Sequence, residues 1–195
     1  MKAERRPGGQ GRPDDRSRKR AAVAGTVALI AVALIVWLVS DGDDSGPAEP
    51  ASGSKSVEVV PQSGLLKALQ GVGYPVYWAG PRSGVEYEVS RSAGRTYVRY
   101  LPRGEEAESQ RPFLTVGSYL QRDALASIRE QGQEPGTILA RSASGGVAYA
   151  EGPDATNAYL AFPGIGVQIE VFDPAPGRAL SLVRSGELVP VGGAG

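Results

Sequence analysis

The chain has 195 residues, including 27 glycines and 15 prolines, and its 21 basic residues balance its 21 acidic ones. It contains no cysteine and no histidine, which excludes disulfides, thiol nucleophiles, Ser-His-Asp triads and metal sites built on Cys or His. Because the balanced charge gives no general attraction to polyanions, we expect no nucleic-acid partner. No motif for a cofactor is present, so the sequence predicts none.

Residues 1–20 are strongly basic. Eight Lys and Arg residues stand there against three acidic ones, and most of the remainder is Gly, Pro, Ser and Gln. A stretch of this composition has too little apolar surface to form a core. We therefore expect a disordered basic tail.

The next segment carries the strongest signal in the sequence. Ala21–Val39 contains no charged residue, and nineteen residues of α-helix span about 29 Å, close to the thickness of a bilayer's hydrocarbon core. Trp37 lies near the far end, where an indole suits the membrane interface, and Asp41 follows closely. The pattern predicts a transmembrane helix over 21–40 that acts as an uncleaved signal-anchor.

Two other kinds of segment are less consistent with this sequence. A cleaved signal peptide has an apolar region of 7–15 residues and an A-x-A site, whereas this run is longer and no such site follows Val39. A buried core helix fits less well, because the segment is apolar on every side and is flanked by opposite charges. The signal-anchor fits best.

The charges on either side of the segment predict its orientation. Arg18, Lys19 and Arg20 touch its start, and Lys55 is the first basic residue after it. Basic flanks stay in the cytoplasm, so we expect a single-pass protein of the cell membrane. Its N-terminus is then cytoplasmic, its C-terminal domain is extracytoplasmic, and the lipid bilayer is its first partner.

Residues 41–56 are rich in Asp, Gly, Pro and Ser and are expected to form a flexible linker to a domain over 57–192. Hydrophobic periodicity and turn residues predict the elements of that domain. The expected strands are 75–79, 85–90, 97–101, 113–119, 137–143, 147–150, 158–162 and 167–172. The expected helices lie near 65–69 and over 120–131 and 176–184, and residues 188–191 close the domain. Successive hairpins favour an α+β fold with an antiparallel sheet and two or three short helices. The hairpin–strand–helix order at 85–131 recurs loosely at 137–184, which hints at a duplicated unit.

The hairpin at 85–101 also predicts a register. A two-residue turn at Ala93-Gly94 places like residues together, with the pairs Val89–Val98, Glu88–Arg99 and Tyr87–Tyr100. One face is then apolar and the other sets opposite charges side by side, whereas a slip of one residue would mix the faces. Ala at the first turn position is unfavourable for a type I′ turn, which requires a positive φ there.

The motifs PVYWAGP at 75–81 and GRTYVRYLP at 94–102 resemble those of uncharacterised, single-pass, membrane-anchored proteins of actinobacteria. The resemblance covers roughly residues 72–190, and with the N-terminal helix it extends to the whole architecture. It implies a location in the cell envelope. It implies no catalytic residue.

Two groups of residues are candidates for ligand contact. Trp78 and Tyr77 stand just before the Gly80-Pro81 break, and the alternative is that these aromatics are core. Carboxylates lie together at Glu105, Glu106 and Glu108 in the loop 102–112, and the alternative is a solvated, charged loop tip.

No nucleophile elbow and no phosphate-binding loop is present, so the sequence carries no catalytic signature. We expect a binding module for another envelope protein or a wall polymer. The other candidate is a hydrolase of envelope material that uses two carboxylates.

Overall fold

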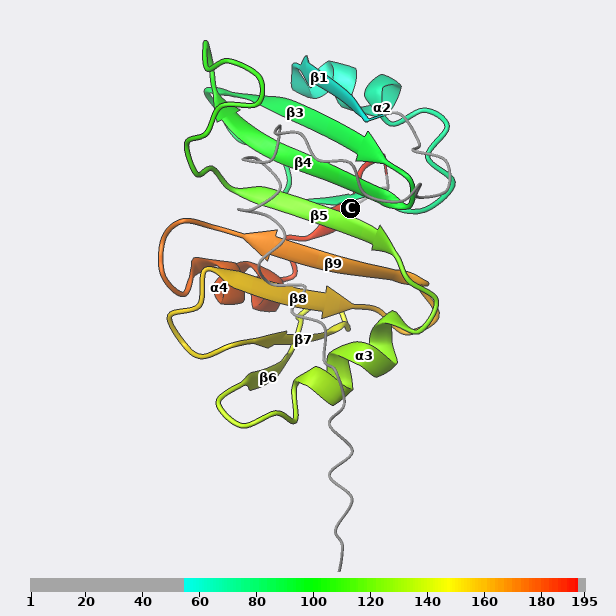
Figure 1. Cartoon of the computed structure of the whole chain (residues 1–195), viewed down its shortest axis with the longest axis vertical. Helices are drawn as coiled ribbons and strands as arrows, with labels where there is room; N and C mark the ends of the chain where they lie inside the picture. Colours follow the sequence, from blue (N-terminus) through cyan, green and yellow to red (C-terminus); the bar gives the residue numbers. More distant parts are fainter. Residues whose placement is uncertain (1–54, 193–195) are drawn as a thin grey trace, which may run out of the picture.

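The structure, a computed structural model, describes residues 55–192 (Figure 1). An eight-stranded antiparallel sheet runs through this part of the chain in the order β1-β3-β4-β5-β9-β8-β7-β6. Its strands are β1 (Ser56–Val60), β3 (Val85–Ser92), β4 (Arg95–Pro102), β5 (Thr115–Leu120), β6 (Ile138–Arg141), β7 (Val147–Ala150), β8 (Asn157–Ala161) and β9 (Val167–Phe172). The predicted α+β class with an antiparallel sheet and short helices is confirmed for these residues.

The shorter elements cover the two faces of the sheet unequally. They are the 3-10 turn η1 (Gln62–Gly64), α2 (Leu65–Ala68), α3 (Ala124–Gln131), α4 (Arg178–Ser185), and the two-stranded ribbon of β2 (Tyr77–Trp78) and β10 (Val189–Pro190). We call the face that packs against α2, α4 and the ribbon the core face, since it holds the main hydrophobic cluster. The opposite, outer face carries α3.

Strands β7 and β8 are buried on both faces. Ala158 belongs to the core-face cluster with α4, whereas its neighbour Tyr159 belongs to the outer-face cluster with α3. Consecutive side chains of a strand point to opposite faces, so the two helices sandwich these strands. Ala148, Ala150 and Ala158 let α4 approach the core face closely, whereas Tyr149 and Tyr159 stack on each other on the face that carries α3.

The strands form two halves of similar arrangement. β3, β4 and β5 follow one another across the sheet, β6 to β9 do so from the other edge, and the last strands of the two halves, β5 and β9, pair in the centre. The helices break this symmetry, because α3 and α4 follow equivalent strands but both pack on β7 and β8, from opposite faces. The hint of a duplicated unit therefore extends to the strands alone.

The β3–β4 hairpin has the predicted register, with Tyr87 opposite Tyr100 and Glu88 opposite Arg99. Both tyrosines lie in the core with rings 5.1 Å apart, and the outer face joins the two charges at 3.5 Å. Ala93 does not have the positive φ that a type I′ turn would require of it. The positive φ falls on Gly94, at 70°. The turn therefore differs from type I′, which needs positive φ at both positions.

Tyrosine hydroxyls anchor the segment after β2 to the sheet. The Ala79 N–H donates to Tyr100 Oη at 2.7 Å, and the same hydroxyl donates to the Gly80 carbonyl at 3.0 Å. The Arg82 N–H donates to Tyr87 Oη at 3.0 Å. Two core side chains thus supply the hydrogen bonds that an irregular segment cannot form with a neighbouring strand.

Several element boundaries differ from those expected. β1 was not predicted as a strand. In place of the expected strand 75–79, β2 has only two residues. Its partner β10 is equally short, and the Ala79 N–H donates to the Tyr100 hydroxyl instead of to a neighbouring strand. The helix expected from residue 120 begins at Ala124, because Leu120 still pairs with Val167 in the sheet. The remaining differences are shifts of one to three residues.

The expected basic tail, transmembrane helix and most of the linker lie outside the described residues. Within residues 55–192, no helix combines the length and the apolar character needed to cross a membrane.

The Tyr100 hydroxyl predicts a measurable stability effect. Tyr100→Phe leaves the buried Ala79 N–H without a partner, so we expect the free energy of unfolding to fall by about 1–3 kcal/mol. Tyr149→Phe is the matched control, because it removes the same atom from a buried tyrosine whose hydroxyl makes no hydrogen bond to a described residue. Urea titration of the full chain, with Trp37 replaced by Phe so that Trp78 alone reports, measures both. Equal effects of the two variants would contradict the anchoring role.

Candidate functional site

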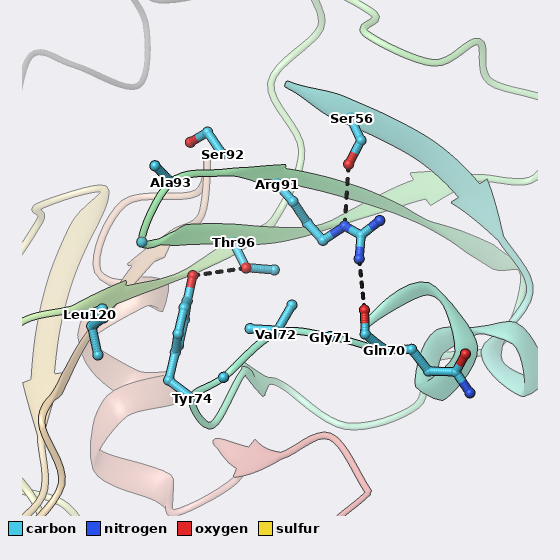
Figure 2. A pocket seen from close by; sticks show the side chains of 12 residues that line it. Ser56, Gln70, Gly71, Val72, Tyr74, Arg91, Ser92, Ala93, Thr96 and Leu120 are labelled. Atoms are coloured by element: carbon cyan, nitrogen blue, oxygen red, sulfur yellow. Dashed lines mark hydrogen bonds between the residues drawn. The ribbon is translucent and has the colours of Figure 1, made fainter. Parts of the chain in front are cut away.

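A hollow of about 530 Å³ opens beside the β3–β4 turn (Figure 2). Its sides come from the start of β1, the end of β3 with the turn at Ala93-Gly94, and the loop 70–74 that follows α2. Gly71 and Gly73 are exposed and have open space where a Cβ would stand. Small residues thus keep the hollow open.

Arg91 is the charged side chain of the hollow. Its Nε donates to Ser56 Oγ at 3.2 Å, and its Nη1 donates to the Gln70 carbonyl at 3.1 Å (Figure 2). The two bonds hold the guanidinium between β1 and the turn that ends α2. Its position is therefore set before any ligand arrives.

The partners of Arg91 distinguish it from the other arginines of the described residues that are at least partly buried. Arg82 lies 3.8 Å from the carboxylate of Glu187, and Arg99 lies 3.5 Å from that of Glu88. Arg91 instead contacts only neutral oxygens. Its positive charge is not matched by a carboxylate within residues 55–192.

Tyr74 forms another wall of the hollow. Its hydroxyl shares a hydrogen bond of 3.0 Å with Thr96 Oγ1, which fixes the ring upright beside the sheet (Figure 2). Burial raises the pKa of this phenol, so the side chain stays neutral. Leu120, whose exposed fraction is 61%, adds apolar surface on the far side.

The acidic loop has internal partners. Glu105 accepts hydrogen bonds from Arg111 and Ser109 at 2.7 and 2.6 Å, and Glu108 pairs with Lys55 at 2.5 Å. Glu106 is exposed. These contacts fold the loop on itself, and they do not bring the three carboxylates together around a common centre.

The same loop is fastened to the outer face of the sheet. The N–H of Glu108 donates to the buried Glu88 carboxylate at 2.5 Å, and Arg99 donates to the carbonyls of Ser109, at 2.6 Å, and Arg111. Glu108 has a φ of 56°, a left-handed conformation uncommon for a residue other than glycine. The Glu88–Arg99 pair thus acts as the support of the loop.

The two aromatic candidates lie apart from this loop. Tyr77 is buried and stacks on Phe162 at 5.4 Å, while Trp78 is partly exposed and packs edge-on against Tyr87 at 5.6 Å. No hydrogen bond, ion pair or ring contact within residues 55–192 joins either of them to the acidic loop. Their assignment as ligand contacts stays a prediction. The predicted membrane-flanking residues Arg18, Lys19, Arg20 and Trp37 lie outside the described residues.

A second polar cluster surrounds Glu170, which is 2% exposed. Its carboxylate accepts hydrogen bonds from Tyr119 and, at 2.8 Å, from Asn157. Gly117 stands opposite Glu170 in the sheet, and the Tyr119 ring lies over this glycine, within 3 Å of the place a Cβ would take. The glycine therefore makes room for the tyrosine to reach the carboxylate.

Burial raises the pKa of Glu170, and the hydrogen bonds from Tyr119 and Asn157 oppose that rise. Tyr159 stands directly opposite in β8, where burial and then the Glu170 carboxylate raise the pKa of its phenol. The Tyr159 hydroxyl is buried without a well-formed hydrogen bond to a described residue. No Lys or Arg pairs with Glu170 in residues 55–192, so no ion pair opposes the rise in its pKa.

Sequence reasoning missed both Arg91 and Glu170. The signal for Arg91 was available, because the predicted register already placed it on the core face with Tyr87 and Val89. The signal for Glu170 was a charge placed directly between the apolar residues Ile169 and Val171 of one strand. No family, curated protein or solved structure matches the chain.

Glu170 predicts a characteristic pH dependence. A carboxyl whose pKa is raised by folding stabilises the protein below its unfolded pKa of about 4.3, and this contribution is lost as the pH rises through the folded value. Glu170→Gln keeps an acceptor for Tyr119 without the charge, so we expect a higher free energy of unfolding at pH 7 and a flatter pH profile above pH 4. The same substitution at the exposed Glu130 should change neither. Denaturation of the full chain across pH 4–8 measures this, and an unchanged profile in Glu170→Gln would contradict it.

Proposed function

We propose that the chain is a membrane-anchored binding module of the cell envelope. The segment 21–40 holds residues 55–192 outside the cytoplasmic membrane, and the hollow beside the β3–β4 turn receives a ligand. The proposal rests on one observation. A partly buried cation without a carboxylate partner stands in an open hollow, held by Ser56 and Gln70.

The local construction supports a role in binding. A positioned guanidinium, a fixed tyrosine ring and an exposed glycine loop provide polar and apolar contacts around one space. Ligand sites usually combine a few placed polar groups with apolar walls in a preformed concavity. A binding module needs no group that transfers a proton or attacks a bond, in line with the absence of a catalytic motif in the sequence.

The described residues hold no observation that favours the carboxylate-dependent hydrolase. Such an enzyme needs two carboxylates about 5–10 Å apart across an open cleft. The one carboxyl in residues 55–192 whose pKa is raised, Glu170, is closed off from solvent, and it faces tyrosines and Asn157. No second carboxylate shares its hydrogen bonds.

The membrane orientation has a direct test, because the chain has no cysteine of its own. Ser83 is exposed and lies in the loop before β3, and Ser17 belongs to the basic tail. In intact cells, a membrane-impermeant maleimide should label Ser83→Cys and should label Ser17→Cys only after permeabilisation. The opposite pattern would overturn the proposed orientation.

Ligand binding at the hollow is tested by photo-crosslinking in the envelope. Ala93 lines the hollow and is exposed, whereas Arg95 is exposed on the same hairpin and does not line it. A benzophenone amino acid at position 93 should give an adduct with an envelope component, identified by mass spectrometry, and the same residue at position 95 should not. Absence of an adduct at 93, or equal adducts at both positions, would contradict the hollow as the binding site.

A further inference from the structure

We infer that the hollow is an oxyanion site, and that Arg91 anchors a carboxylate or phosphate group of a small organic ligand. The inference rests on the proposed function and names the ligand class. The N–H donors of Arg91 are its first support. A guanidinium carries five N–H donors. Two of them are engaged, by Ser56 and Gln70.

The remaining donors of Arg91 make no bond to a described residue. They are enough for a two-point contact with an oxyanion, the contact for which a guanidinium is best suited. The two existing bonds also hold the side chain in place, so little of its conformational entropy is lost when a ligand binds.

The charge of the surroundings favours an anion. None of the residues that line the hollow within the described part of the chain is Asp or Glu. Elsewhere in residues 55–192, the partly buried arginines Arg82 and Arg99 each face a carboxylate. An anionic ligand would give Arg91 the partner that the fold gives to the other two.

The main chain adds uncharged donors beside this cation. Gly71 and Gly73 are exposed in the loop that borders the hollow, and their N–H groups make no hydrogen bond to a described residue. With no side chain in the way, a ligand can approach this backbone closely. The loop can therefore contribute to binding of an oxyanion without any further charge.

The apolar walls indicate what carries the anionic group. The Tyr74 ring is fixed by Thr96, and Val72 and Leu120 add apolar surface to the same hollow. An inorganic ion would leave the apolar surface of the hollow exposed to water. An organic acid or a phosphate monoester with a flat body fills both parts of the space.

A purely structural role for Arg91 is the alternative, since its two bonds also tie β1 to the turn after α2. The two roles predict a different dependence of ligand binding on charge. A structural arginine leaves binding unaffected by ligand charge, whereas an anchoring arginine makes binding depend on both the charge of the ligand and the guanidinium.

The test uses the isotope-labelled full chain and three probes that each carry one phenyl ring, namely benzoate, phenyl phosphate and neutral benzamide. We expect benzoate or phenyl phosphate to shift the amide signals of Gly71, Gly73 and Gly94, and benzamide to bind at least tenfold more weakly. The comparison of benzoate with phenyl phosphate shows whether a carboxylate or a phosphate is preferred.

Two variants and one control assign the binding to Arg91 and to the hollow. Arg91→Gln keeps a donor for the Gln70 carbonyl and should weaken anion binding at least tenfold. Gly73→Leu should block the hollow with Arg91 intact, because Gly73 has a permitted φ and open space for a side chain. Arg95→Gln removes the same charge from the neighbouring strand and should leave binding unchanged. The amide spectrum of each variant shows that it is folded.

The outcomes separate the inference from the proposed function. Equal binding of benzamide and benzoate, or unchanged anion binding in Arg91→Gln, would overturn the oxyanion site and leave the hollow as a binding site. No shift with any probe would also overturn the oxyanion site. The crosslinking experiment at position 93 decides the proposed function independently.

Discussion

The register of the β3–β4 hairpin is the constraint on which the rest of the domain depends. It turns Tyr87 and Tyr100 inward, where their hydroxyls hold the segment after β2, and turns Glu88 and Arg99 outward, where they support the acidic loop. A slip of one residue would turn one strand over relative to the other, so that Tyr87 would lie opposite Arg99 and the two faces would be mixed. The same register places Arg91 on the core face, beyond the tyrosines and beside the hollow.

Burial on two faces explains the uneven composition of the sheet. β7 and β8 lie between α3 and α4, with alanines toward α4 and the larger Tyr149 and Tyr159 toward α3. Glu170 occupies this region of low solvent access, which is energetically costly for a charged group. The cost is limited because Tyr119 reaches the carboxylate across Gly117. A buried polar group in this domain is thus accommodated by a backbone position that lacks a side chain.

The sequence pattern over a few neighbouring residues was enough to predict most strands, the helices and one register. The alternation of apolar and polar residues and the turn-forming residues are properties of such short segments. The central pairing of β5 with β9 was beyond that range, since it joins segments separated by α3 and three further strands. The edge strand β1 went unrecognised. The hollow could not be predicted either, because Arg91 meets Ser56 and Gln70 only after the sheet and α2 have packed. Sequence reasoning therefore named residues beside turns and in a loop, and it missed Arg91 and Glu170, whose partners come from distant parts of the chain.

The position of β9 has a consequence for biosynthesis. It is the last strand of the large sheet to be synthesised, yet it lies in the centre, where it joins the two halves. Until residues 167–172 are available to pair, β5 and β8 each present an unpaired edge, and such edges are templates for aggregation. The large sheet therefore cannot be completed until nearly the whole length of the domain is available. A chain cut short before β9 would leave two separate meanders, each with an open edge.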